Sequence, residues 1–178
     1  LRDVFLEPPF SVLDSKGGAW QQRKKMWKSL GIKSELGRDV ECNASFGGEL
    51  DEKGLNKYGR KPMLGVSVFD PALCELIYRW YCPENGKILD PFAGGSVRGI
   101  VANYLKYHYT GIDIRQEQID CNREQALDIL EVNNQSNWYV GDSNEVLIGM
   151  KNDYDLIFSC PPYADLEVYS DIDGDISN

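Results

Sequence analysis

The chain has 178 residues, about the length of one domain, and its 42% hydrophobic and 26% charged residues are ordinary globular usage. This composition excludes collagen-like, mucin-like and wholly disordered proteins, and no stretch reaches the roughly 18 apolar residues of a membrane span. The formal net charge of −9 argues against a general nucleic-acid coat protein, which would be basic.

The charge is unevenly distributed along the chain. Residues 1–65 carry 12 Lys/Arg against 9 Asp/Glu, a net of +3, whereas residues 66–178 carry 7 against 19, a net of −12. We therefore expect any contact with a polyanion to fall in the N-terminal part of the chain.

Cysteine and histidine content argues against a metal site. The five cysteines form no Cys-x-x-Cys pair and His108 is the single histidine, so we predict no bound metal. Reduced thiols and an N-terminus without the pattern of a signal peptide are typical of a cytoplasmic protein, which is the location we predict.

The N-terminal third is predicted to be irregular. We assign residues 1–60 to an extension that precedes a domain at residues 61–178, and we predict one helix in it, over residues 19–30. The aromatic and basic residues on the faces of this helix are Trp20, Lys24, Trp27 and Lys28. Two interpretations stay open: a surface helix whose tryptophans pack on the main domain, or a basic, aromatic element that contacts a nucleic-acid backbone.

From residue 68 onward, predicted helices and strands alternate. Asp70 suits a helix N-cap and Pro71 the first helical position. The predicted order is a helix from Asp70, a strand at 87–90, a helix at 97–105 with Tyr104 facing inward, a strand at 107–114, a helix through 119–130, and strands at 138–140 and 155–158. The short links favour an α/β fold with a mainly parallel sheet flanked by helices on both faces. Right-handed crossovers then bring the carboxyl ends of all strands to one edge.

The most unusual residues fall at that edge, where ligands bind in open α/β sheets. Residues 90–96 (Asp-Pro-Phe-Ala-Gly-Gly-Ser) place small residues before a helix N-terminus, which lets the backbone approach a ligand closely. The acid at the start of this loop suits a cationic group. Asp113 ends the second strand, where a carboxylate can accept both hydroxyls of a ribose. Asp142 ends the third strand and can accept from an adenine amine, although each acid also suits a helix N-cap.

Residues 159–163 (Ser-Cys-Pro-Pro-Tyr) follow the fourth strand. Two prolines cannot continue a sheet ladder, and they form a rigid backbone without N–H groups whose carbonyls point outward. The aromatic ring of Tyr163 can then lie flat against a planar base. A simple strand-ending turn is the alternative interpretation.

Together, residues 90–96 and 159–163 resemble the D-P-F-x-G-x-G cofactor motif and the (D/N/S)-P-P-(Y/F/W) catalytic motif of the S-adenosylmethionine-dependent DNA amino-methyltransferases. The resemblance covers residues 61–163, and the N-terminal region is similar to bacteriophage-type DNA modification methylases. It implies a Rossmann-like methyltransferase fold that transfers a methyl group from S-adenosylmethionine to adenine N6 or cytosine N4 of double-stranded DNA. The target base would leave the stack before it reacts.

The resemblance also implies roles for individual residues. The methionine part of the cofactor would be held at Asp90, Phe92, Ala93, Gly94 and Gly95. The ribose would be held by Asp113, and the adenine would lie against Ile114, Asp142 and Ser143. The catalytic motif comprises Ser159, Cys160, Pro161, Pro162 and Tyr163. In it the Pro161 carbonyl would accept a hydrogen from the target amine and Tyr163 would stack on the flipped base.

Two positions depart from the family pattern. Cys160 stands where the family has Asp, Asn or Ser, and a thiol is a weak acceptor. Ser159 is one residue too early, unless a shifted backbone lets it serve. Both target atoms, adenine N6 and cytosine N4, therefore remain open. Ser96 replaces a usual glycine. Covalent methylation at cytosine C5 is disfavoured, because that chemistry places the cysteine after the proline.

The family fold has seven strands and four are predicted here, so we expect a sheet truncated after the fourth strand. Its open edge would be covered by a missing C-terminal segment or by self-association. Two alternative functions keep part of this chemistry: an RNA base methyltransferase, and a catalytically impaired module that binds the cofactor and nucleic acid. A nucleotide-dependent oxidoreductase is disfavoured by the Pro-Pro-Tyr motif.

Overall fold

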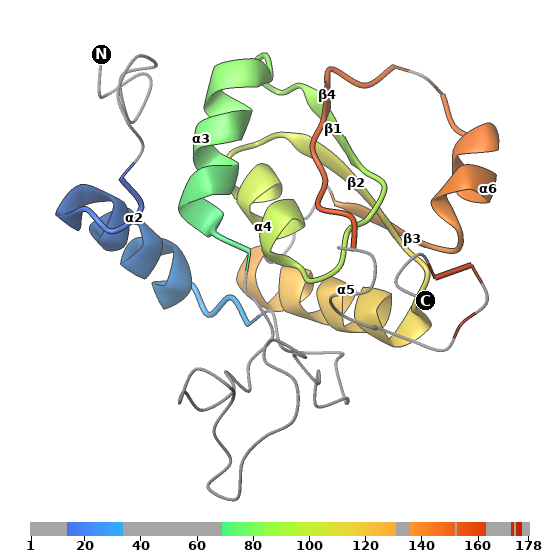
Figure 1. Cartoon of the computed structure of the whole chain (residues 1–178), viewed down its shortest axis with the longest axis horizontal. Helices are drawn as coiled ribbons and strands as arrows, with labels where there is room; N and C mark the ends of the chain where they lie inside the picture. Colours follow the sequence, from blue (N-terminus) through green and yellow to red (C-terminus); the bar gives the residue numbers. More distant parts are fainter. Residues whose placement is uncertain are drawn as a thin grey trace, which may run out of the picture.

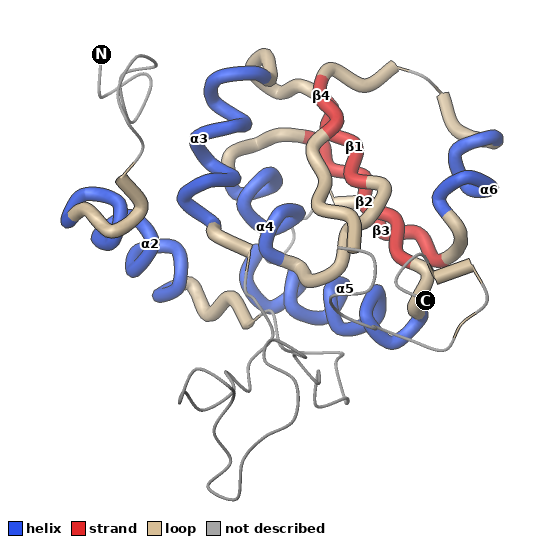
Figure 2. The backbone as a smooth tube through the Cα atoms, in the orientation of Figure 1, coloured by secondary structure: helices blue, strands red, loops and turns tan. Residues whose placement is uncertain are grey.

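A computed structural model of the chain describes residues 14–33, 69–130, 136–151, 153–162, 172 and 174–175. Within these residues, four parallel strands form one sheet in the order β3-β2-β1-β4 (Figures 1 and 2). The strands are β1 (Lys87–Asp90), β2 (His108–Asp113), β3 (Asn137–Val140) and β4 (Leu156–Ile157). The all-parallel order confirms the predicted direction of the strands.

The central strands β1 and β2 are buried except at their ends, as expected for a parallel sheet covered on both faces. Ile88 of β1 lies opposite Tyr109 of β2, and the register continues to Asp90 opposite Gly111. The edge strand β4 is shorter than the predicted 155–158. One hydrogen bond on each side, from Asp155 N to Lys87 O and from Phe158 N to Leu89 O, continues its pairing with β1.

The helices form two layers around the sheet. Figure 1 shows α3 (Pro71–Tyr81), α4 (Val97–Tyr104) and α5 (Gln116–Leu130) on one side of it and α6 (Ser143–Ile148) on the other. This arrangement confirms the Rossmann-like α/β fold. Helix α6 was not predicted from the sequence, because a helix of six residues is too short to show an apolar period. No helix in the described ranges is long and apolar enough to cross a bilayer.

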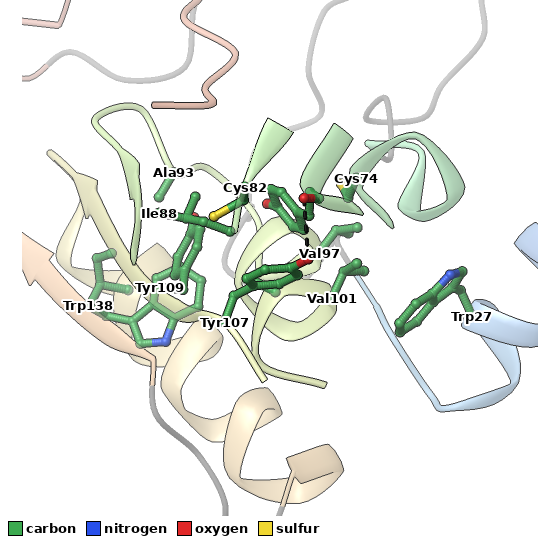
Figure 3. Packing of buried hydrophobic residues seen from close by; sticks show 13 residues of the cluster. Trp27, Cys74, Cys82, Ile88, Ala93, Val97, Val101, Tyr107, Tyr109 and Trp138 are labelled. Atoms are coloured by element: carbon green, nitrogen blue, oxygen red, sulfur yellow. Dashed lines mark hydrogen bonds between the residues drawn. The ribbon is translucent and has the colours of Figure 1, made fainter. Parts of the chain in front are cut away.

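The core lies between the sheet and α3, α4 and α5. Figure 3 shows Ile88, Tyr109 and Trp138 from the strands near Val97 and Val101 from α4. Two glycines allow this close packing. A Cβ atom on Gly99 would lie 2.5 Å from Trp138 Cζ2, and one on Gly111 would lie 2.7 Å from Tyr109 Cε1. A larger residue at Gly99 would push α4 away from the sheet, and one at Gly111 would displace the rings of Tyr109 and Trp138.

The remaining helix, α2 (Gly18–Ser29), packs against α3. Trp27 is completely buried, and its indole Nε1 donates to Glu75 Oε2 at 2.7 Å. Arg23 forms a second contact with Glu75, through two hydrogen bonds. The interpretation that this helix packs on the main domain is therefore confirmed for Trp27. The division of the chain after residue 60 stays a prediction.

Tyr104 was expected to face inward, and that prediction is wrong. Its side chain is 51% exposed, because it lies at the last position of α4, beyond the cover of the sheet. Its ring still contacts Trp27 edge-on, with 5.1 Å between the ring centroids.

Glu75 is the acid that attaches α2 to the domain. Its carboxylate is completely buried and accepts from Arg23, Trp27 and Arg79. Burial alone would raise the pKa of Glu75, but these donors outweigh it and hold the pKa below its ordinary value. The charged form of Glu75 is therefore the one that stabilises the folded chain.

We expect Glu75→Gln to lower the free energy of unfolding at neutral pH by about 2 kcal/mol, because buried donors lose a charged acceptor. Since folding lowers the pKa of Glu75, its contribution is complete above the ordinary value of 4.5 and is lost as the pH falls through the lower folded-state value. The difference in free energy of unfolding between wild type and variant, measured with urea, should therefore shrink as the pH falls below 4.5. Asp153→Asn, which breaks an exposed pair with Lys87, is the control and should change little. A difference that is independent of pH would contradict the assignment.

Candidate active site

Four segments meet at the carboxyl edge of the sheet. The loop 90–96 follows β1, Asp113 ends β2, Asp142 follows β3, and residues 159–162 follow β4. Because the strands are parallel, all four segments lie at the same edge, which is where α/β sheets bind ligands. The predicted site residues in the described ranges are thus assembled along one edge.

The centre of this edge is the completely buried carboxylate of Asp90. Its Oδ2 atom accepts from Arg98 Nε at 2.5 Å and from the Tyr109 hydroxyl at 2.6 Å. Its Oδ1 atom accepts from the Ser159 hydroxyl at 2.5 Å and from Phe92 N at 3.3 Å. Both oxygens of Asp90 therefore have partners inside the protein, which compensates for the loss of water around the buried charge.

Arg98 connects this carboxylate to the loop that follows it. Besides its bond to Asp90, the guanidinium donates through Nη2 to Phe92 O at 2.6 Å and to Ala93 O at 2.9 Å. It also lies 4.6 Å from the centre of the Phe69 ring. Burial alone would lower the pKa of Arg98, but the charge of Asp90 outweighs it and raises the pKa. Arg98 is therefore a permanent cation that fixes the first half of the loop.

Three backbone N–H groups of the loop, those of Phe92, Ala93 and Gly94, donate within the protein. Phe92 N donates to the Ser159 hydroxyl at 3.0 Å, and Ala93 N donates to Ile112 O at 2.8 Å. The side chain of Ala93 is completely buried. Gly94 N donates to Asp113 Oδ2 at 2.9 Å, and Gly94 has a φ of +49°, a conformation that glycine adopts readily. The loop is thus attached to β2 on one side and to Ser159 on the other.

Asp113 closes the loop from the second strand. Its Oδ1 atom accepts from Arg115 N at 3.0 Å, in addition to the bond between Oδ2 and Gly94 N. Asn122 of α5 reinforces the same turn, because its Nδ2 atom donates to Gly94 O at 2.7 Å. The structure therefore brings Asp113 and the loop 90–96 together, as the sequence predicted.

The third strand end carries the residues predicted to lie against adenine. Asp142 is the N-cap of α6 and accepts from Asn144 N at 2.8 Å, while Ile114 is half-buried and Ser143 is buried. A turn near the C-terminus lies against two of them. A Cβ atom on Gly174 would be 3.6 Å from Asp142 Oδ2 and 3.7 Å from Ile114 Cδ1. The N-cap interpretation of Asp142 is confirmed, and its contact with adenine stays a prediction.

The last segment is the Ser-Cys-Pro-Pro run after β4. Ser159, Cys160 and Pro162 are half-buried, whereas Pro161 is exposed. The hydroxyl of Ser159 is held between Asp90 Oδ1 and Phe92 N, so in this structure it faces the loop 90–96. Tyr163 lies outside the described residues. The catalytic roles predicted for this run stay predictions.

Sequence reasoning missed Arg98, Tyr109 and Phe69. Arg98 is the one charged residue of helix α4, whose other residues are uncharged. This isolated charge in a mostly apolar helix was the signal that could have indicated a buried role. The other two carry no such signal, because buried aromatic residues in an α/β core usually serve packing.

The fold and the edge define a class of protein: the Rossmann-like α/β domains, in which ligands bind at the carboxyl ends of the strands. A family model described as a DNA methylase matches residues 16–124, which is more than half of the chain. The chain therefore belongs to this family, the N6-adenine and N4-cytosine DNA methyltransferases. The matched range includes α2, the loop 90–96 and Asp113, and it ends before Asp142 and Cys160. No curated protein matches the chain.

We expect Arg98→Met to lower the free energy of unfolding by about 3 kcal/mol, because the Asp90 carboxylate would stay buried without its cation. Lys87→Met is the control, since it removes an exposed ion pair with Asp153 and should have little effect. Urea unfolding followed by circular dichroism measures both. If the two variants lost equal stability, the role assigned to Arg98 would be wrong.

Proposed function

We propose that the protein transfers a methyl group from S-adenosylmethionine to the exocyclic amine of a base in DNA, adenine N6 or cytosine N4. The observation that carries the proposal is the pair of hydrogen bonds made by Ser159. They join Ser159, which lies two residues before Pro161, to Asp90 and to Phe92 of the glycine-rich loop. Methyl transfer requires the donor and the acceptor in contact, and these bonds hold the two candidate binding segments side by side.

The residues at the edge suit this cofactor. Its ribose hydroxyls and adenine amine are hydrogen-bond donors, and Asp113 and Asp142 present acceptors at successive strand ends. Gly94 and Gly95 are partly exposed and carry no side chain, so their backbone could approach the methionine part closely. When bound, S-adenosylmethionine supplies an electrophilic methyl group on a sulfonium. Asp90 then acts through the loop that it orders, since its carboxylate is surrounded by protein donors.

The Pro-Pro motif would prepare the amine. The lone pair of an aromatic amine is delocalised into the ring, which makes the nitrogen a poor nucleophile. A carbonyl at Pro161 that accepts one hydrogen, together with an acceptor at position 160, would draw the nitrogen toward tetrahedral geometry and localise that lone pair. The base would leave the stack for this contact, at a cost of a few kcal/mol, and Tyr163 would stack on it.

Cys160 favours a second candidate, an impaired module that binds cofactor and DNA with little turnover. Because the Ser159 hydroxyl is held by Asp90 and Phe92, it does not replace the acceptor that the family places at position 160. A thiol is a weak acceptor there. The bacteriophage-type origin, double-stranded DNA in preference to RNA, and the cytoplasmic location stay predictions.

We expect saturable binding of S-adenosylmethionine by calorimetry, and a loss of at least tenfold in affinity for Asp113→Ala, because charged acceptors contribute about 1.5–3 kcal/mol. Asp113→Asn keeps an acceptor for Gly94 N and separates loss of the loop from loss of the charge. Asp120→Ala, an exposed acid on α5, is the matched control. Equal affinity in all four proteins would contradict the placement of the ribose.

We expect Cys160→Asn or Cys160→Ser to raise kcat at least tenfold, in line with the gain expected from a well-placed acceptor, with unchanged affinity for the cofactor. The assay follows transfer of a labelled methyl group into DNA and into RNA, and nucleoside analysis then identifies the modified base. A lower kcat in both variants would show that the thiol itself is suited to the reaction. Label found only in RNA would contradict the proposed substrate.

A further inference from the structure

Helix α2 and the residues around it form a part of the described chain whose net charge is positive. Residues 14–33 hold six Lys/Arg and one Asp, whereas the other described residues hold seven Lys/Arg and 14 Asp/Glu. A protein of net charge −9 that acts on DNA needs a local cationic surface, since the rest of the molecule repels phosphate. The sequence predicted such a surface in this part of the chain.

The inner side of α2 is occupied by its contacts with α3. Arg23 pairs with Glu75, and Lys24 Nζ lies 3.0 Å from Asp70 Oδ2, which also accepts from Trp20 Nε1 at 3.1 Å. Burial would raise the pKa of Asp70, but these donors lower it, so Asp70 stays charged and neutralises Lys24. Arg23 and Lys24 are therefore neutralised by acids of the domain and stabilise the packing of α2 on it.

The neighbouring side of α2 carries cations of a different kind. Gln21, Lys25 and Lys28 follow at spacings of four and three residues, so they share one side of the helix, and all three are exposed. Neither Lys25 nor Lys28 forms an ion pair with a described residue. We name Gln21, Lys25 and Lys28 the lysine flank. It has no apolar stripe for insertion into a membrane or a protein groove.

Helix α2 is linked to the candidate active site through Asp70 and Phe69. Asp70, which binds Trp20 and Lys24, is followed by α3, and the preceding residue Phe69 reaches the site. The Phe69 ring lies 5.7 Å from that of Phe158, just before Ser159, and 4.6 Å from the guanidinium of Arg98. Figure 1 shows α2 beside the first turns of α3. DNA whose base enters the site would therefore pass near α2.

We propose that the lysine flank of α2 binds the phosphate backbone of the DNA substrate. This inference rests on the proposed function. The buried contact between Trp27 and Glu75 holds α2 firmly on the domain, so Lys25 and Lys28 are presented at a fixed distance from the site. Such contacts position the duplex without reading its sequence.

The test compares Lys25→Gln/Lys28→Gln with Lys106→Gln/Lys151→Gln. The control lysines are exposed and precede β2 and β4, so they lie toward the amino ends of the strands, away from the carboxyl ends that form the candidate site. Binding of a short fluorescein-labelled duplex is followed by fluorescence anisotropy between about 50 and 200 mM salt. We expect the flank variant to bind at least tenfold more weakly at low salt. Its slope of log affinity against log salt should be shallower by about 2, because each phosphate contact contributes about 0.9.

Kinetics give a second readout. Loss of phosphate contacts should raise KM for DNA and leave kcat and the affinity for S-adenosylmethionine unchanged. Equal affinities and salt slopes for the flank variant and wild type, or absence of DNA binding by wild type, would overturn the inference. Failure of the proposed function is read separately, from the calorimetry with Asp113→Ala and from the methyl-transfer assay.

Discussion

The buried ion pair between Asp90 and Arg98 is the interaction on which the rest of the site depends. Two opposite charges removed from water are stable only when their hydrogen-bonding capacity is satisfied. Here the remaining donors and acceptors come from Tyr109, Ser159 and the loop carbonyls of Phe92 and Ala93. Satisfying one charge pair therefore orders the glycine-rich loop and joins it to the end of β4.

This arrangement gives the first acid of the cofactor motif a role in positioning. A carboxylate exposed to the ligand would exchange its partners whenever the ligand left. Asp90 instead has its partners inside the protein, so the hydrogen bonds that order the loop involve no ligand. In the proposed function the ligand would contact the backbone at Gly94 and Gly95, which continues this loop, and the Asp113 carboxylate, which accepts from Gly94 N.

Two further acids have a comparable role, since they hold a whole helix, α2, on the domain. Asp70, the N-cap of α3, and Glu75, within α3, neutralise Lys24 and Arg23 on the inner side of α2, and Glu75 also accepts from the buried Trp27. The helix is thereby fixed with its remaining lysines outward. In the proposed interaction with DNA, these lysines would give an acidic protein a cationic surface for phosphate, since local charge and not net charge decides such a contact.

The sequence by itself determined the parallel α/β fold and the edge at which its acids lie. Strand periodicity and crossover handedness act locally along the chain, so the positions of Asp113 and Asp142 at strand ends could be predicted from the order of residues alone. The helical character of residues 19–30 was visible for the same reason. The short helix α6 was not, because it has fewer than two turns.

Only the tertiary structure decided which polar groups satisfy one another. Ser159 and Asp90 are 69 residues apart and Arg23 and Glu75 are 52 apart, so no local pattern in the sequence links them. The isolated charge of Arg98 in α4 is visible in the sequence, but the buried carboxylate that it meets, Asp90, is not. Its role follows from burial, because a charge removed from water requires a partner at hydrogen-bond distance, and folding alone determines which residue that is.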